Sequence, residues 1–178
     1  MTSDEDLMLA CRAGSADAFE ELFRRYRRAI WAYFPRRLPD AGRAEELSQE
    51  TFVAVLEGAA RYEPRAQVRT YLYGIAFNLL SAERRRQHIR RVAPLDEARS
   101  TTRRSDPDTA IWVAHALGEL DPNDREIVML REYEQLTYAE IAELLGIPLN
   151  TVRSRLFRAR LELRRLLTPD VRAQGSVR

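Results

Sequence analysis

The sequence predicts an all-α protein of two small helical domains joined by a flexible linker, with a helix-turn-helix in the C-terminal domain. Three observations predict this fold. Apolar residues recur at helical spacing along most of the chain, and no segment alternates as a strand does. A stretch rich in Ser, Thr, Arg and Asp, with two prolines, covers residues 91–107. Near the C-terminus, a glycine separates two short apolar-periodic segments.

The domain boundaries are expected from composition. The first domain is expected over residues 1–90, the linker over 91–107 and the second domain over 108–167. Residues 168–178 are expected to form a disordered tail. A length of 178 residues suits two small domains, and 45% of the residues are apolar or aromatic, which is enough for two packed cores.

Composition also excludes several classes of function. Cys11 is the single cysteine, so no internal disulfide can form, and two distant histidines do not complete a zinc site. We therefore expect no metal and no cofactor. The acidic N-terminus lacks the apolar core of a signal peptide, and no apolar run reaches the roughly 20 residues of a membrane span. We expect a cytoplasmic protein.

Four helices are expected in the N-terminal domain. Residues 3–6 have the form of a helix cap, and Gly14 ends the first helix. A second helix carries an apolar stripe from Phe19 to Tyr33. The third is expected over residues 44–57 and the fourth over residues 68–90. The residues of the third helix that are expected to point inward are Leu47, Phe52, Val55 and Leu56.

The C-terminal domain contains local patterns that define helix ends. Asp121 precedes Pro122, which suits a helix cap followed by proline at the first helical position. Thr137 and Glu140 have the spacing of a capping box. The helix that follows is expected over residues 138–145, and Gly146 supplies the left-handed residue that ends it.

The last helix of this domain is predicted to read DNA. A buried stripe is expected at Val152, Leu156, Ala159 and Leu163. Residues 148–167 contain six arginines and one glutamate, whereas residues 119–146 contain eight acidic residues and two arginines. The planar guanidinium group of arginine suits phosphates and guanine edges. The second helix of a helix-turn-helix typically enters the major groove. The alternative interpretation is an amphipathic helix whose charged side faces only solvent. The residues expected to contact duplex DNA are Asn150, Thr151, Arg153, Ser154, Arg155, Phe157 and Arg158.

These motifs resemble those of one protein family. Residues 138–146 (YAEIAELLG) and 151–160 (TVRSRLFRAR) resemble the promoter −35 reader of extracytoplasmic-function (ECF) sigma factors. Residues 44–56 (AEELSQETFVAVL) are similar to the family segment that binds a coiled coil of the RNA polymerase β′ subunit. Residues 71–78 (YLYGIAFN) are similar to the helix that melts the −10 element. The resemblance extends over about residues 5–167.

The resemblance implies a function and partners. The protein would bind core RNA polymerase through the β′ coiled coil and the β flap, and direct it to promoter DNA. The C-terminal domain would read the −35 duplex while the N-terminal domain opens the −10 region. The protein itself would not be an enzyme, and an anti-sigma protein is an expected regulatory partner.

The resemblance also implies a pocket for a flipped −10 base, formed by Tyr62, Ile75 and Asn78. Residues 61–67 would be the loop that selects the base, with Arg65 as its DNA-binding residue. An aromatic and an aliphatic side chain can sandwich a base, and an amide offers both a donor and an acceptor to its edge. Alternatives remain for two of these residues, because Tyr62 could fold onto its own core and Ile75 also fits the apolar stripe. Asn78 has low helix propensity and no evident core role.

The polymerase-binding residues implied by the resemblance are Glu45, Glu46, Leu47, Gln49 and Glu50. Residues 40–57 contain five acidic residues and one arginine, so this segment would repel DNA and suits a protein partner.

Two functions other than that of a sigma factor are possible alternatives. A helix-turn-helix repressor or activator leaves residues 44–56 and Asn78 unexplained. An enzyme lacks any phosphate-binding glycine loop, metal cluster or nucleophile–base pair in the sequence.

Overall fold

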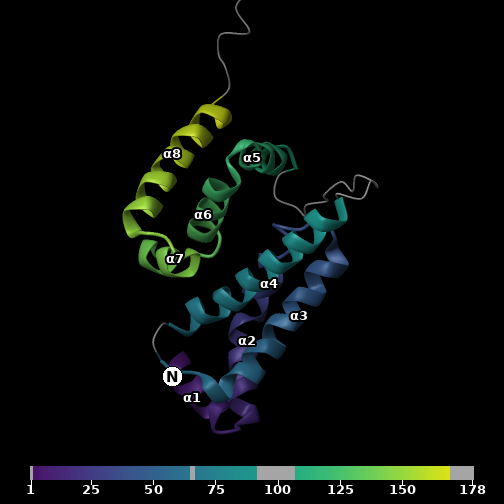
Figure 1. Cartoon of the computed structure of the whole chain (residues 1–178), viewed down its shortest axis with the longest axis vertical. Coiled ribbons are helices and arrows are strands. Elements are labelled where there is room, and N and C mark those ends of the chain that lie inside the picture. The colour runs from purple at the N-terminus through teal and green to yellow at the C-terminus, as the bar shows by residue number, and fades with distance from the viewer. Residues whose placement is uncertain (1, 65–66, 92–106, 169–178) are drawn as a thin grey trace, which may run out of the picture. The chain divides into compact units, whose positions relative to one another are not determined.

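All regular structure is helical in the part of the chain that the computed structural model describes, residues 2–64, 67–91 and 107–168 (Figure 1). The expected linker, apart from its first and last residues, and the expected tail beyond Thr168 lie outside these residues. The helices are α1 (Asp4–Arg12), α2 (Ala16–Tyr33), α3 (Ala41–Gly58), the 3₁₀ helix η1 (Ala59–Arg61), α4 (Val68–Arg91), α5 (Pro107–Glu119), α6 (Pro122–Glu132), α7 (Tyr138–Leu145) and α8 (Leu149–Leu167).

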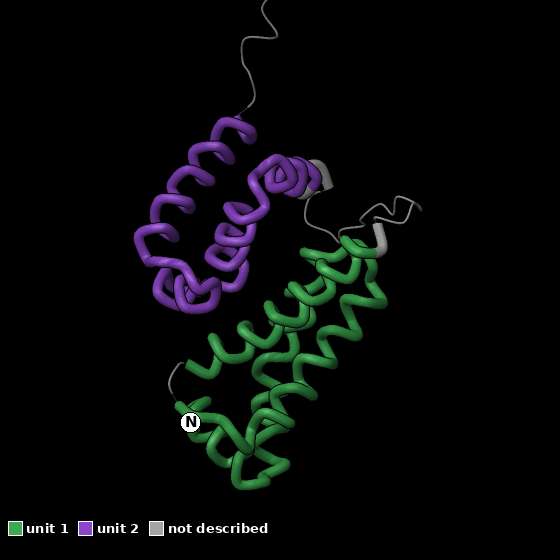
Figure 2. The backbone as a smooth tube through the Cα atoms, in the orientation of Figure 1, with its two compact units in different colours: residues 1–102 green, residues 103–178 purple. Residues whose placement is uncertain are grey.

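The chain divides into two compact units, residues 1–102 and 103–178 (Figure 2). In the first unit α1 packs on α2, α2 on α3, and α3 along α4. Tightly packed apolar side chains at the centre of these helices supply most of the driving force for folding. The largest fully buried side chains here are Met8, Leu22, Ile30, Tyr33, Phe34, Leu47, Leu72 and Leu80.

The second unit is built on α8, which packs against α6, α7 and α5. Its fully buried large side chains are Ile127, Leu130, Leu136 and Ile141. This arrangement confirms the prediction of two helical units with a helix-turn-helix, α7–Gly146–α8, in the second.

Helix ends lie where the sequence predicted caps. Ser3 and Asp6 form a capping box at the start of α1, and Thr137 and Glu140 form one at the start of α7. Each box satisfies backbone N–H groups that a helix start leaves unpaired. Gly146 has φ 63°, in the left-handed region that favours glycine.

The third helix differs from expectation in two respects. It begins at Ala41 rather than residue 44, because the Asp40 side chain accepts a hydrogen bond from the Arg43 amide and caps the helix earlier. Leu56 was expected to point inward, and this prediction is wrong: its side chain is 53% exposed. Val55 is buried, and one residue further along a helix the side chain is rotated by about 100° from its neighbour.

Candidate nucleic-acid interface

Helix α8 is amphipathic, and its buried stripe fixes the direction of its polar face. Val152, Leu156 and Ala159 are at most 1% exposed and pack among α6 and α7. They recur at spacings of four and three residues, so they lie along one side of the helix. The opposite side is therefore presented outward by the packing of the whole unit.

The outward side of α8 carries most of the residues predicted to contact DNA. Arg153, Ser154, Phe157 and Arg158 are exposed, as is Asn150 in the first turn. The Arg153 guanidinium donates a hydrogen bond to Asn150 Oδ1 at 3.3 Å, which keeps both side chains on the same part of the surface. Phe157 is 65% exposed on the same side of the helix.

Four of the six arginines of α8 fall into two groups; of the other two, Arg165 pairs with Glu162 of the same helix. Arg160 Nη2 lies 2.7 Å from Glu132 of α6, and Arg155 lies 4.0 Å from Asp124 of the same helix. These two contacts connect α8 to α6. Within the described residues Arg153 and Arg158 form no ion pair with a carboxylate, so their guanidinium groups remain available for phosphates or base edges.

The predicted pair of −10 residues on α4 lies partly at the surface. Asn78 is exposed and Ile75 is half-buried. The stripe that anchors the helix consists of Leu72, Ala76 and Leu80, all at most 1% exposed. The Asn78 amide therefore lies on a side of α4 that the core does not use.

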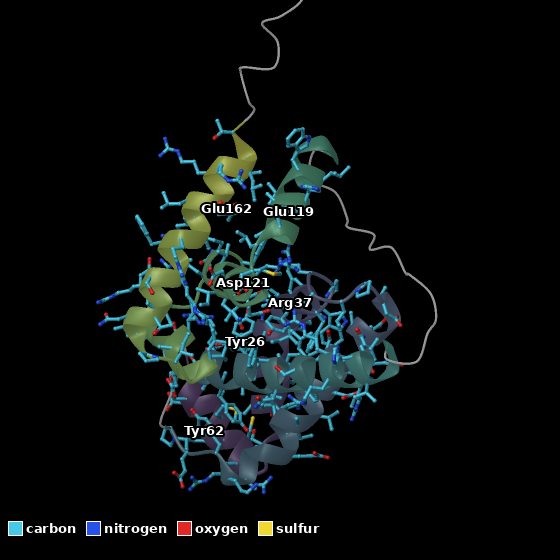
Figure 3. All side chains as sticks on the ribbon, turned by 45° about the horizontal axis from the view of Figure 1, so that its top comes forward. Tyr26, Arg37, Tyr62, Glu119, Asp121 and Glu162 are labelled. Carbon is cyan, nitrogen blue, oxygen red and sulfur yellow. The ribbon has the colours of Figure 1, made fainter. Side chains whose placement is uncertain are left out.

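Tyr62 lies inside the N-terminal unit, where Figure 3 shows it near α1. Its side chain is 4% exposed, and its ring contacts Tyr71 edge-on at 5.4 Å between centroids. Arg12 donates a hydrogen bond to the Tyr62 carbonyl oxygen at 3.3 Å. Burial raises the pKa of the Tyr62 phenol, and its hydroxyl has no hydrogen-bond partner within the described residues.

The sequence left open that Tyr62 packs on the core of its own unit, and this is the arrangement in the structure. A base could reach this ring only after the side chain or its loop moves. Arg65, the predicted DNA-binding residue of the base-selecting loop, lies outside the described residues. The structure therefore brings Ile75 and Asn78 together on one helix but leaves the Tyr62 ring buried, so the three-residue pocket is not formed.

Helix α3 exposes a mixed acidic and apolar surface. Glu45, Glu46, Gln49 and Glu50 are exposed, whereas Leu47 is 1% exposed and belongs to the core. Leu47 therefore supports this surface from beneath and is not part of it. A shallow hollow of about 450 Å³ is lined by Glu46, Gln49, Glu50, Val53, Ala54, Glu57 and Leu79.

Sequence reasoning missed Val53, which is 54% exposed in the middle of that hollow. Val53 follows Gln49 by four residues and Glu50 by three, so it shares their side of the helix. Helical spacing from the polar residues would have identified it. Hydrophobicity alone assigns a valine to the core.

The described part of the chain offers neither a metal site nor a membrane-spanning helix. No group of three or more His, Cys, Asp and Glu side chains there could hold a metal ion. None of the helices resolved there combines the length and apolarity that crossing a membrane requires.

Comparison with known families accounts for both units. Residues 22–89 match the family described as Sigma-70 region 2, and residues 110–163 match Sigma-70, region 4. The chain belongs to the sigma-70 family of RNA polymerase sigma factors. Within that family it is an alternative sigma factor of the ECF group, and sigma factors are specificity subunits of the polymerase rather than enzymes. The match over residues 22–89 explains the half of the chain that a helix-turn-helix repressor leaves unexplained.

The relatives cover nearly the whole chain. The RNA polymerase sigma factor YlaC of Bacillus subtilis is 32% identical over 161 residues, which cover 85% of this chain and 93% of the relative. CarQ of Myxococcus xanthus is 34% identical over 161 residues, covering 88% and 92%. The ECF sigma factor SigC of Mycobacterium tuberculosis is 30% identical over 177 residues, covering 92% and 91%.

Solved structures show the same fold. CnrH, in complex with the cytosolic domain of CnrY, matches with a TM-score of 0.75 and 25% identity, covering 95% of this chain and 99% of that one. The sigma factor RpoE of Bartonella quintana, in complex with the anti-sigma factor NepR, matches with a TM-score of 0.74 and 20% identity, covering 85% and 98%. The second similarity establishes the fold alone.

Proposed function

We propose that this sigma factor reads the −35 promoter element with α8 and opens the −10 element with α4 while bound to core RNA polymerase. The observation that carries the proposal is the outward side of α8, where Arg153 and Arg158 are exposed without an ionic partner in the described residues. Unpaired arginines on the second helix of a helix-turn-helix suit guanine edges in the major groove.

The −10 role rests on α4. Asn78 presents an amide donor and acceptor outward, beside the half-buried Ile75. Extruding a base costs a few kcal/mol, so a pocket must return a comparable amount through stacking and hydrogen bonds. Movement of Tyr62 would add an aromatic surface and give its unpaired buried hydroxyl a partner. Arg65 is proposed to contact the same strand from the loop.

The polymerase-binding role rests on α3, through Glu45, Glu46, Gln49 and Glu50, with Leu47 as internal support. The acidic side chains would pair with basic groups of the β′ coiled coil, and Val53 would add apolar contact within the hollow. In the C-terminal unit, Ile111 and Trp112 of α5 are more than 60% exposed. We assign this apolar surface to the β flap.

An anti-sigma protein is the proposed regulatory partner. CnrH and the Bartonella RpoE were each solved with a second protein, CnrY and NepR respectively. A partner of this kind would cover the polymerase-binding surface of α3 and prevent initiation until it is released.

Core binding and promoter-specific transcription test the proposed function together. Purified protein is incubated with core RNA polymerase, and the complex is isolated and supplied with a library of promoter fragments. We expect a stable complex and transcripts from fragments that share a −35 and a −10 sequence. Tight binding of specific duplex by the free protein, without binding to core, would contradict the proposal.

A further inference from the structure

We propose that Arg43 is a positioning residue for polymerase binding: it aligns the carboxylates of Glu46 and Glu50 and is itself held by the buried carboxylate of Glu83. The inference rests on the proposed role of α3 as the polymerase-binding helix. It adds a residue that would not touch the polymerase but would set the geometry of two that do.

The guanidinium of Arg43 contacts three carboxylates at once. Its Nε donates a hydrogen bond to Glu83 Oε2 at 2.9 Å, across from α3 to α4. Its Nη1 donates to Glu46 Oε2 at 2.8 Å and to Glu50 Oε1 at 2.9 Å. The planar fork of arginine can satisfy several acceptors in fixed directions, which the single point charge of lysine cannot do.

Burial decreases steadily from the inner carboxylate to the outer ones. The side chain of Glu83 is 7% exposed and that of Arg43 is 20% exposed, whereas those of Glu50 and Glu46 are 45% and 65% exposed. The inner end is therefore fixed by packing, and the outer end faces the solvent. A guanidinium anchored at its inner end holds its outer hydrogen bonds in one direction.

Glu83 is a firm anchor because its charge is compensated inside the unit. Burial acts to raise the pKa of Glu83, but hydrogen bonds from Arg43 and Gln87 outweigh it and hold the pKa below its ordinary value. Gln87 Nε2 donates to Glu83 Oε1 at 3.2 Å, and Arg86 lies 3.9 Å from Glu83 Oε2. A buried carboxylate that stays ionised keeps its cationic partner in place.

The outer carboxylates need such a partner. Glu46 and Glu50 are four residues apart on one side of α3, where like charges repel. Bonded to one guanidinium, they are held side by side, and each has a second oxygen without a hydrogen-bond partner in the described residues. Both glutamates line the hollow that also contains Val53. Ordering two long side chains before association lowers the entropy lost on binding.

The test compares variants for affinity to core RNA polymerase and for thermal stability. Arg43→Gln alone leaves Glu83 buried without its main partner, so the decisive variant is Arg43→Gln combined with Glu83→Gln. We expect this double variant to melt close to the wild type yet to bind core about three- to tenfold more weakly, as contacting residues couple to that extent. Arg43→Lys should recover part of the lost affinity because it restores the charge without the fork.

Two controls separate alignment from net charge and from the role of α3 itself. Arg24→Gln combined with Glu21→Gln removes an exposed ion pair of α2, conserves net charge as the Arg43/Glu83 variant does, and should leave core affinity unchanged. In a background of Glu46→Gln with Glu50→Gln, the Arg43/Glu83 double change should have no further effect. The positioning role alone would be overturned if the Arg43/Glu83 variant bound core with wild-type affinity. It would also be overturned if the Arg43/Glu83 change lowered core affinity equally in the Glu46→Gln/Glu50→Gln background. Unchanged affinity after Glu46→Gln with Glu50→Gln would overturn both this role and the assignment of α3.

Discussion

Helices α3 and α8 carry opposite charge, and they differ in how that charge is held. On α3 the exposed carboxylates of Glu46 and Glu50 are bonded to Arg43, which a buried glutamate anchors. On α8 the outward arginines Arg153 and Arg158 have no carboxylate partner in the described residues. Fixed charges suit a protein surface of one shape, whereas unrestrained arginines can adjust to base edges and phosphates along a groove.

The same difference implies different responses to salt. Contacts from α8 to phosphates would release condensed counterions, so DNA affinity should fall steeply as salt concentration rises. The ion pair of Arg43 with Glu83 is buried and therefore little screened, whereas Glu46 and Glu50 face the solvent. Salt should therefore weaken contacts of these two glutamates with a basic partner without releasing their inner anchor.

The largest expected effect separates the two units. Leu156→Ala removes a fully buried side chain of α8 and should lower the free energy of unfolding of the C-terminal unit by about 2–5 kcal/mol. Trp112 of α5 and Trp31 of α2 place one fluorescent reporter in each unit. In urea titrations of single-tryptophan forms, the Trp112 transition should shift and the Trp31 transition should not. An equal shift of both transitions would show that the units do not unfold separately.

A smaller effect tests the unpaired arginines of α8. Arg158→Ala should weaken use of the −35 element by about 1–3 kcal/mol, the range for a lost bidentate base contact. The measurement is initiation by the holoenzyme on promoters with systematic −35 substitutions. Arg164→Ala, an exposed arginine in the last turn of the same helix, is the matched control and should preserve the preference. Unchanged discrimination in Arg158→Ala would contradict its reading role.

Asn78→Ala tests whether the N-terminal unit touches the opened strand. The loss of neutral hydrogen bonds to a base edge should cost about 0.5–1.5 kcal/mol for each bond. Opening of the −10 region, followed by reactivity of unpaired thymines, should therefore fall several-fold. Core affinity should stay at the wild-type value, because Asn78 is exposed on α4 outside the buried stripe. Loss of core binding instead would show that Asn78 has a structural role.

The smallest effect concerns α7, which packs against α8. Thr137→Ala removes one half of the capping box of α7 and should destabilise the C-terminal unit by about 1 kcal/mol. The Trp112 transition reports this change, and −35 preference should persist in the folded fraction. An unchanged transition would mean that solvent replaces the cap at no cost.

Local sequence patterns were sufficient to predict the helix-turn-helix. Capping residues, the left-handed glycine and the apolar stripe of α8 each involve residues within a few positions of one another, so their physics is visible in one stretch of chain. The same holds for Asn78, whose exposure follows from its position opposite the buried residues of α4.

Features that depend on distant segments were not predictable in this way. The contact of Arg43 with Glu83 joins residues 40 positions apart, and nothing in either segment alone identifies the partner. The burial of Tyr62 depends on Tyr71 and on α1, which close over the loop only in the folded unit. The burial of Leu47, by contrast, was predicted from its helical spacing, and only the resemblance to the family motif placed it also among the polymerase-binding residues.

Run-off transcription with core polymerase most directly tests the proposal that the C-terminal unit reads the −35 element and the N-terminal unit opens the −10 element. Promoters that carry a changed −35 element, a changed −10 element or a pre-opened −10 bubble are compared for the wild type, Arg158→Ala and Asn78→Ala. The account predicts that a pre-opened bubble rescues Asn78→Ala but not Arg158→Ala, and that only Arg158→Ala loses discrimination at −35. Rescue of both variants by the bubble, or of neither, would contradict it.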